Sequence, residues 1–226
     1  MQNLFDINEN DNTYSKKITN LIKFKNFGFN VPDGIVLSQS DFDTISLDDI
    51  PFDIFSIRSA TFGEDNPDSS FAGVFNTILN STKDTFFDDL KIVINSFYSK
   101  KSIIYQNLKN ITVVPQILIQ PMITSLLSSV IFIDNNHIKI SLNNGSCNDI
   151  VSGTKNCFTY EFLIDDFKHS DIKFPDELVN NNFILFIKKI LINININSNM
   201  LIDIETTFDG NKWWVLQYRE LNFIRI

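Results

Sequence analysis

Cysteine and histidine are scarce in this sequence of 226 residues, which contains two of each. Cys147 and Cys157 have no histidine beside them and no second pair at metal-ligand spacing, which argues against a zinc site. Two cysteines are also too few for a disulfide framework, so we expect the reducing cytoplasm as the compartment. His137 and His169 lie in polar surroundings, and we expect both to be ordinary surface residues.

Long hydrophobic runs and an excess of basic charge are missing as well. The first twelve residues are polar and acidic, unlike a signal peptide. The most apolar late stretch, residues 183–192, contains Lys188 and Lys189 and is too short to span a bilayer. The net charge of -8 argues against a nucleic-acid partner. It does not exclude ATP, because a nucleotide site needs only a few local cations and a metal ion.

What is present is the pattern of a mixed globular chain. Apolar residues at helical spacing predict helices over residues 15–27, 87–105 and 177–192. Apolar or alternating runs predict strands over residues 35–37, 55–58, 113–120, 129–134, 138–142, 201–207 and 213–218. The runs 113–120 and 129–134 are candidates for a pair across the loop between them. Residues 192–197 alternate Ile with Asn, and a strand, a continued helix and a loop all remain open there.

The combination of helices with hairpin-linked strands favours an α+β fold. No Gly/Ser/Pro-rich linker divides the chain, and the best internal boundary lies near Asn110. We therefore expect two lobes, residues 1–110 and residues 111–226.

An arginine enters a polar loop directly after a predicted strand. In residues 56–73 a strand delivers Arg58 into a stretch rich in Ser, Gly, Asp and Pro. The planar guanidinium suits phosphate oxygens, and the small neighbouring residues let backbone N–H groups approach an anion. A surface loop in which Arg58 pairs with Glu64 or Asp65 explains the spacing equally well.

The same loop resembles a segment of the phosphoenolpyruvate synthase / pyruvate phosphate dikinase family, approximately V-R-S-S-A-T-A-E-D-L-P-x-A-S-F-A-G. The sequence reproduces the arginine, E-D, the proline and S-F-A-G at the same spacing. In that family the arginine contacts the ATP phosphates, so the resemblance implies this role for Arg58.

A second resemblance lies in the N-terminal segment. Residues 14–21 and 28–34 resemble the family's G-G-K-x-x-N-L and G-F-x-V-P-x-G, which places Lys17 on the phosphate-binding lysine. Ser15 and Lys16 replace the two glycines. Without the resemblance, solvated lysines on a helix face are the simpler interpretation.

Two carboxylates lie on one side of a predicted hairpin near the C-terminus. Asp203 and Glu205 are two residues apart on a strand and so project from the same face, and Asp209-Gly210 is a strong hairpin turn. Across that turn, Gln217 or Arg219 comes alongside. Such a cluster suits Mg²⁺, although a half-exposed hairpin with polar residues facing water has the same pattern.

The hairpin resembles the family's D-I-E followed by L-Q-x-R. The resemblance implies that Glu205 and Gln217 bind Mg–ATP, that Asp203 supports the metal or the electrostatics of catalysis, and that Arg219 binds phosphate.

The middle of the chain carries weaker similarities. Residues 119–122 resemble the family's V-Q-x-M hinge, whose backbone meets the adenine edge, which implies nucleotide contacts for Gln120 and Met122. Residues 144–153 resemble G-L-G-E-x-V-V-S-G, with Asp149 near, but offset from, the acidic position. Core strands and a loop explain these segments equally well.

The resemblance extends from Lys17 to Arg219 and implies an ATP-grasp fold with nucleotide bound between two lobes. The implied activity is phosphoryl transfer from Mg–ATP, with Lys17, Arg58 and Asp203 in the catalytic site. The acceptor is a small molecule or a histidine on a separate partner protein, and the absence of a phosphohistidine segment favours the small molecule. A degenerate, non-catalytic nucleotide-binding or regulatory domain is the alternative.

Overall fold

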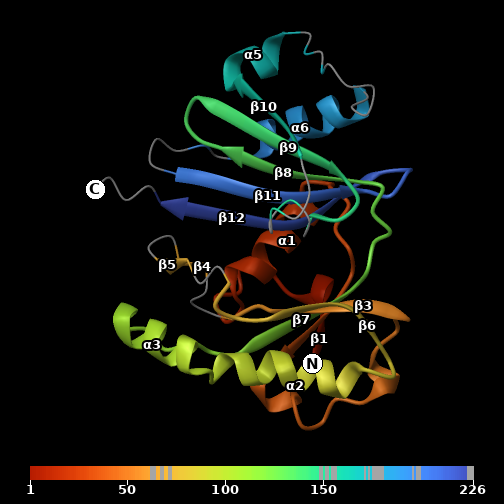
Figure 1. Ribbon diagram of the computed structural model, residues 1–226, viewed down its shortest axis with the longest axis vertical. Coiled ribbons are helices and arrows are strands. Elements are labelled where there is room, and N and C mark those ends of the chain that lie inside the picture. The colour runs from red at the N-terminus through yellow and green to blue at the C-terminus, as the bar shows by residue number, and fades with distance from the viewer. Residues whose placement is uncertain are drawn as a thin grey trace. The chain divides into compact units, whose positions relative to one another are not determined.

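The computed structural model describes residues 1–61, 65–66, 69–70, 73–147, 150, 153, 157–170, 172, 174, 181–194, 196 and 200–222. The fold is α+β and consists of two compact units (Figure 1). The first unit comprises residues 1–26 and 31–123, and the second comprises residues 27–30 and 124–226. Among the described helices, none combines the length and the apolar character that crossing a bilayer requires.

The first unit is built on a five-stranded antiparallel sheet of order β1-β2-β7-β3-β6. Its helices and strands are β1 (Gln2–Asn3), η1 (Leu4–Asp6), α1 (Lys16–Asn26), β2 (Ile35–Ser38), η2 (Gln39–Asp41), η3 (Leu47–Asp49), β3 (Ile54–Ser59), β4 (Asp65–Asn66), β5 (Ser69–Ser70), β6 (Thr77–Thr82), α2 (Phe86–Phe97), α3 (Lys100–Lys109) and β7 (Gln116–Pro121).

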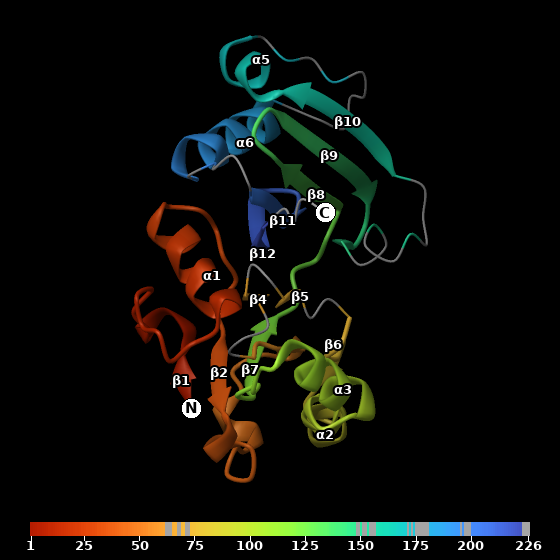
Figure 2. The same cartoon turned by 90° about the vertical axis from the view of Figure 1, so that its left-hand side faces the viewer.

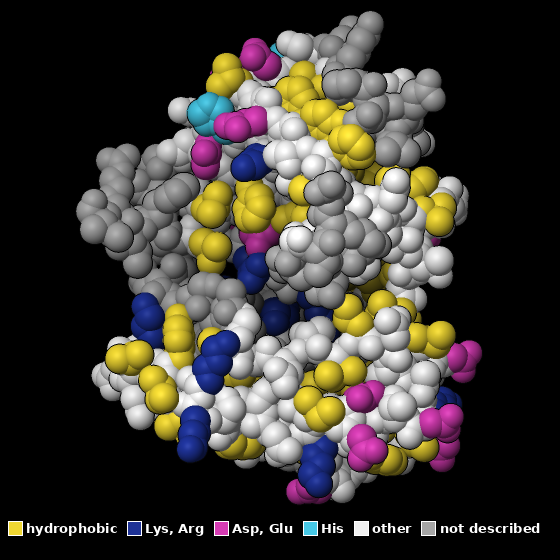
Figure 3. Space-filling view, in the orientation of Figure 1, with side chains coloured by type: hydrophobic (Ala, Val, Ile, Leu, Met, Phe, Trp, Pro, Cys, Tyr) yellow, Lys and Arg dark blue, Asp and Glu magenta, His cyan; other side chains and the backbone are white. Residues whose placement is uncertain are grey.

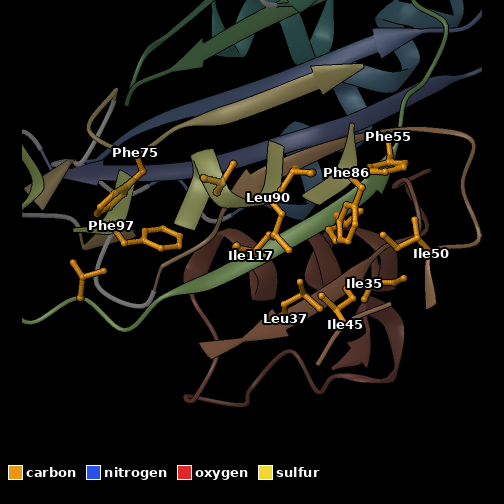
Figure 4. Packing of buried hydrophobic residues seen from close by; sticks show 14 of the residues in the cluster. Ile35, Leu37, Ile45, Ile50, Phe55, Phe75, Phe86, Leu90, Phe97 and Ile117 are labelled. Carbon is orange, nitrogen blue, oxygen red and sulfur yellow. The ribbon is translucent and has the colours of Figure 1, made fainter. Parts of the chain in front are cut away.

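The core of this unit lies between the sheet and α2. Phe86, fully buried near the start of α2, meets the ring of Phe55 edge-on at a centroid distance of 6.0 Å. Leu90 and Phe97 continue the same helix face, and Ile117 of β7 belongs to the same cluster (Figure 4). The 3.6-residue period places these side chains in one stripe, and burying that stripe holds the helix on the sheet.

The helix predicted over residues 87–105 is two helices in the structure. α2 ends at Phe97, and α3 begins after Ser99, whose hydroxyl accepts a hydrogen bond from the backbone N–H of Ser102. This N-cap satisfies a free N–H group at the start of α3 and explains the break. α3 buries only Ser102, and hydrophobic and basic side chains gather over it on the molecular surface (Figure 3).

The second unit contains a five-stranded antiparallel sheet of order β10-β9-β8-β11-β12. Its helices and strands are β8 (Leu127–Ile133), β9 (His137–Asn144), β10 (Phe158–Leu163), α5 (Ile164–His169), α6 (Asn181–Asn193), β11 (Met200–Phe208) and β12 (Trp213–Asn222).

One face of this sheet is apolar and carries the helices (Figure 2). Alternation along the strands places Ile204 of β11, Ile131 of β8 and Ile140 of β9 side by side on this face. Phe162 of β10 meets Phe167 of α5, and Phe183 of α6 lies 4.3 Å from Trp213 of β12 between ring centroids. The opposite face is mostly polar, with Asp203, Glu205, Gln217 and Arg219 in adjacent positions.

Several expectations differ from this architecture. Residues 113–120 and 129–134 do not pair, because β7 lies between β2 and β3 in the first sheet while β8 lies between β9 and β11 in the second. The boundary expected after residue 110 falls earlier than the observed division after residue 123, since β7 belongs to the first unit. Apolar periodicity does not reveal which of two sheets a strand joins.

The predicted helix at residues 15–27 and the hairpin at residues 201–218 are confirmed. The helix predicted from residue 177 is described from Asn181 onward and ends at Asn193, and residues 177–180 lie outside the described part. His137 and His169 are exposed, as expected.

Candidate nucleotide and metal site

Glu205 and Gln217 form the centre of the polar face. They are direct cross-strand partners on β11 and β12, and Gln217 Nε2 donates to Glu205 Oε1 at 3.3 Å. Gln217 is buried, whereas Glu205 is half-buried. This contact leaves Glu205 Oε2 and the amide oxygen of Gln217 outside that hydrogen bond, and oxygens of these types are ligands for a hard cation.

Asp203 and Arg219 form the next cross-strand pair along the hairpin. The Arg219 Nε and Nη2 atoms both donate to Asp203 Oδ2, the first at 3.1 Å. The second carboxylate oxygen, Oδ1, is buried with no hydrogen-bond partner in the described structure. Burial raises the pKa of the Asp203 carboxyl, the nearby Arg219 guanidinium offsets part of that rise, and the Glu205 carboxylate adds to it.

A β-bulge helps to orient these groups. The register of β11 against β12 shifts between Glu205 and Thr206, so that Leu216 is the extra residue of β12. On the helix-facing side, the hydroxyls of Thr206 and Ser129 are 2.7 Å apart, and Cys147 Sγ donates to the Thr206 carbonyl at 3.0 Å. Bulges commonly re-aim side chains next to functional sites.

Lys17 and Arg58 are brought together in the first unit although 41 positions of sequence separate them. Lys17 lies in the first turn of α1, is buried, and donates from Nζ to the carbonyl of Ser59 at 2.6 Å. Ser59 directly follows Arg58 at the end of β3. The two cations expected to bind phosphate therefore lie at one end of β3.

The N-terminus of α1 is anchored by Gln116 of β7. Gln116 Oε1 accepts the backbone N–H of Ser15 at 2.9 Å, and Gln116 Nε2 donates to the Thr13 carbonyl at 2.7 Å. Ser15 is buried where the family pattern has glycine, and the backbone there is held by a side chain that the sequence did not single out. Lys16 is exposed.

Gln120 and Met122, expected at the adenine hinge, both make contacts within the first unit. Gln120 is buried and donates from Nε2 to the Pro32 carbonyl at 2.9 Å. A Cβ at Gly34 would meet Gln120 Cγ and the Ile119 carbonyl at 2.9 Å, which explains the glycine. The Met122 N–H donates to the Ile54 carbonyl. A nucleotide contact by Gln120 or Met122 remains a prediction.

A hydroxyl cluster close to residue 124, where the second unit resumes, is a feature that sequence reasoning missed. Ser125, Ser128 and Thr207 hydrogen-bond to one another and to the carbonyls of Gly145 and Leu127. Serine and threonine are common in loops, so only the strand register could have revealed the cluster. Asp149, offset in the family pattern, lies outside the described residues.

The residues present fit a metal ion that is held partly by its substrate. Within the described ranges, no group of three or more His, Cys, Asp or Glu side chains could hold a metal ion by itself. Mg²⁺ is usually bound through one or two carboxylates together with substrate phosphates. The half-buried Glu205 carboxylate and the orphaned Asp203 Oδ1 supply such a partial set.

The family model described as pyruvate phosphate dikinase, AMP/ATP-binding domain, matches residues 2–166. No curated protein matches the chain closely enough to count as a relative.

Solved structures resemble the chain in fold. D-Alanine-D-alanine ligase from Helicobacter pylori superposes with a TM-score of 0.54 at 13% identity, covering 90% of this chain and 53% of that one. PH1788 from Pyrococcus horikoshii Ot3 has a TM-score of 0.50 at 13% identity, covering 91% and 90%. L-amino acid ligase from Bacillus licheniformis has a TM-score of 0.50 at 10% identity, covering 90% and 42%. The chain thus spans about half the length of the two ligases, and the expected ATP-grasp fold is confirmed.

Proposed function

Because the chain belongs to the pyruvate phosphate dikinase AMP/ATP-binding domain family, we propose that it is a phosphotransferase that uses Mg–ATP. The acceptor is a small molecule or a histidine on a separate partner protein. The observation that carries the proposal is the polar sheet face on which Asp203, Glu205, Gln217 and Arg219 lie in two adjacent cross-strand pairs.

The hairpin residues hold the metal end of the site. Glu205 and Gln217 would hold Mg²⁺ there, and the ion would supply positive charge that offsets the charge of the phosphates. Glu205 and Gln217 offer oxygen ligands, and their mutual hydrogen bond fixes the orientation of both side chains. Asp203 presents a second carboxylate on the same face, with Oδ2 held by Arg219.

The basic residues bind the phosphates. In this proposal the phosphate contacts are assigned to Lys17, Arg58 and Arg219, which are basic residues in a chain with a net charge of -8. Burial increases the electrostatic effect of Lys17, because a cation acts more strongly where water is excluded. Catalysis then depends on positioning and charge stabilisation and needs no covalent intermediate on the protein.

The test compares two charge-removing, nearly isosteric substitutions on one sheet face. Glu205→Gln is expected to weaken Mg–ATP binding, measured by calorimetry, about tenfold or more, since interactions with charged groups contribute about 1.5–3 kcal/mol. Glu161→Gln is the matched control, because the exposed Glu161 is on the edge strand β10, which β9 and β8 separate from β11. Equal binding by wild type and both variants contradicts the assignment.

Turnover is measured separately, by phosphorus NMR over a panel of metabolites, which distinguishes ADP from AMP plus phosphate. Consumption of ATP that depends on one acceptor is the expected result. Binding of ATP without turnover of any acceptor, including histidine-bearing partner proteins, supports the non-catalytic nucleotide-binding alternative.

A further inference from the structure

The starting observation is the position of Asn143 on the sheet of the second unit. Asn143 of β9 is paired with Ser128 of β8, which in turn is paired with Thr207 of β11. Two residues further along the strands, Ser141, Val130 and Glu205 form the corresponding row. Because side chains two residues apart project from the same face, Asn143 lies on the same polar face as Glu205.

Asn143 is buried, with 7% of its surface exposed, and its Nδ2 atom has no hydrogen-bond partner in the described part of the chain. The adjacent hydroxyls of Ser128 and Thr207 are already engaged with each other and with backbone carbonyls. Buried side-chain donors in folded proteins nearly always have a partner. The described residues therefore supply no acceptor for Asn143 Nδ2, which leaves this buried donor available to a ligand.

The distance from Glu205 suits the opposite end of a nucleotide. Asn143 is two strand spacings across the sheet and two residues along the strands from Glu205. Standard strand dimensions make this roughly 12 Å between the Cα atoms. Asn143 also lies near the end of β9, close to the hydroxyl cluster in which Ser125 bonds to Ser128 and to the Gly145 carbonyl. A nucleotide whose phosphates meet Glu205 can extend its nucleoside part toward Asn143.

We propose that Asn143 is a specificity-determining residue, whose Nδ2 donates a hydrogen bond to an acceptor on the nucleoside part of ATP. The inference rests on the proposed function, since it requires ATP to bind this face with its phosphates at Glu205. The acceptor is a ring nitrogen of the base or an oxygen of the ribose, and both have the same chemistry toward an amide donor.

The experiment measures calorimetric binding of two ligands in the presence of Mg²⁺, ATP and inorganic tripolyphosphate, which lacks the nucleoside. Asn143→Ala is expected to weaken ATP binding about threefold to tenfold and to leave tripolyphosphate binding unchanged, since it removes a single hydrogen bond. Asn144→Ala is the matched control, because the adjacent, exposed Asn144 projects from the other face. It is expected to bind both ligands as wild type does.

Two analogues locate the acceptor. 2′-Deoxy-ATP lacks a ribose hydroxyl, and inosine triphosphate carries N–H where adenine has the ring acceptor N1. If Asn143 contacts the 2′-hydroxyl or N1, the analogue that lacks this acceptor is expected to bind wild type about as weakly as ATP binds Asn143→Ala.

If Asn143→Ala does not fold, as judged by circular dichroism, the nearly isosteric Asn143→Asp replaces it. This variant is expected to lose more ATP affinity, because it sets a carboxylate against an acceptor.

The outcomes separate this inference from the proposed function. If wild type binds ATP, Glu205→Gln weakens that binding and the Asn143 variants do not, the role of Asn143 is wrong and the proposed function stands. Equal losses of ATP and tripolyphosphate affinity in Asn143→Ala also overturn the role, because they indicate a general structural effect. Failure of wild type to bind either ligand overturns the proposed function itself.

Discussion

At the scale of single residues, Asp203 makes the stability of the protein depend on pH. Its pKa is raised in the folded protein, chiefly by burial, so the folded state binds its proton more tightly than the unfolded state does. The free energy of unfolding therefore falls as the pH rises from the ordinary aspartate pKa of about 3.9 through the raised folded value. Asp203→Asn removes this dependence. The difference in melting temperature, Asp203→Asn minus wild type, is expected to increase as the pH rises across this window and then to stay constant.

Asp209 provides a control, because its pKa is shifted in the opposite direction and its effect on stability with rising pH is therefore opposite. Hydrogen bonds from the Lys212 backbone N–H and the Trp214 side chain lower its pKa, so wild type gains stability as the pH rises through the lowered value. The melting temperature of Asp209→Asn is expected to fall relative to that of wild type as the pH rises from the lowered pKa of Asp209 to the ordinary aspartate pKa of about 3.9. A parallel pH profile for wild type and Asp203→Asn contradicts the account of Asp203.

At the scale of elements, α2 shows how one helix face holds the first unit together. Phe86 is fully buried, whereas its neighbour Phe87 is 54% exposed. Phe86→Ala is expected to lower the free energy of unfolding by about 3–5 kcal/mol, because it removes buried area and leaves a cavity. Phe87→Ala is expected to change it by at most about 0.5 kcal/mol. Urea denaturation followed by circular dichroism measures both, and similar losses in the two variants are inconsistent with this packing.

At the scale of the whole molecule, the two units each have their own sheet and core. Both tryptophans of the chain, Trp213 and Trp214, are on β12, so tryptophan fluorescence reports on the second unit alone. In Phe86→Ala, the transition followed by circular dichroism is expected to begin at a lower denaturant concentration than the transition followed by fluorescence. Coincident transitions in the variant indicate that the two units unfold as one cooperative body.

Local pattern was enough to predict most elements near the site. The hairpin of β11 and β12 follows from two alternating apolar runs around Asp209-Gly210, and α1 follows from apolar residues at helical spacing before Gly28. The break between α2 and α3 was missed because the apolar spacing continues across Ser99. The sheet to which residues 113–120 belong could not be predicted, since strand pairing depends on contacts distant in sequence.

By itself, the sequence determined the residue types and local spacings of the candidate site: Arg58 after a strand, Lys17 at a helix start, and two carboxylates two residues apart. The tertiary structure decided which of these residues meet. It placed the Lys17 ammonium on the carbonyl of Ser59, which follows Arg58, and it paired Arg219 with Asp203. It also buried the Asn143 side chain, whose Nδ2 donor has no partner among the described residues. These contacts depend on strand register and burial, which are set by packing across the whole chain rather than by neighbours in sequence.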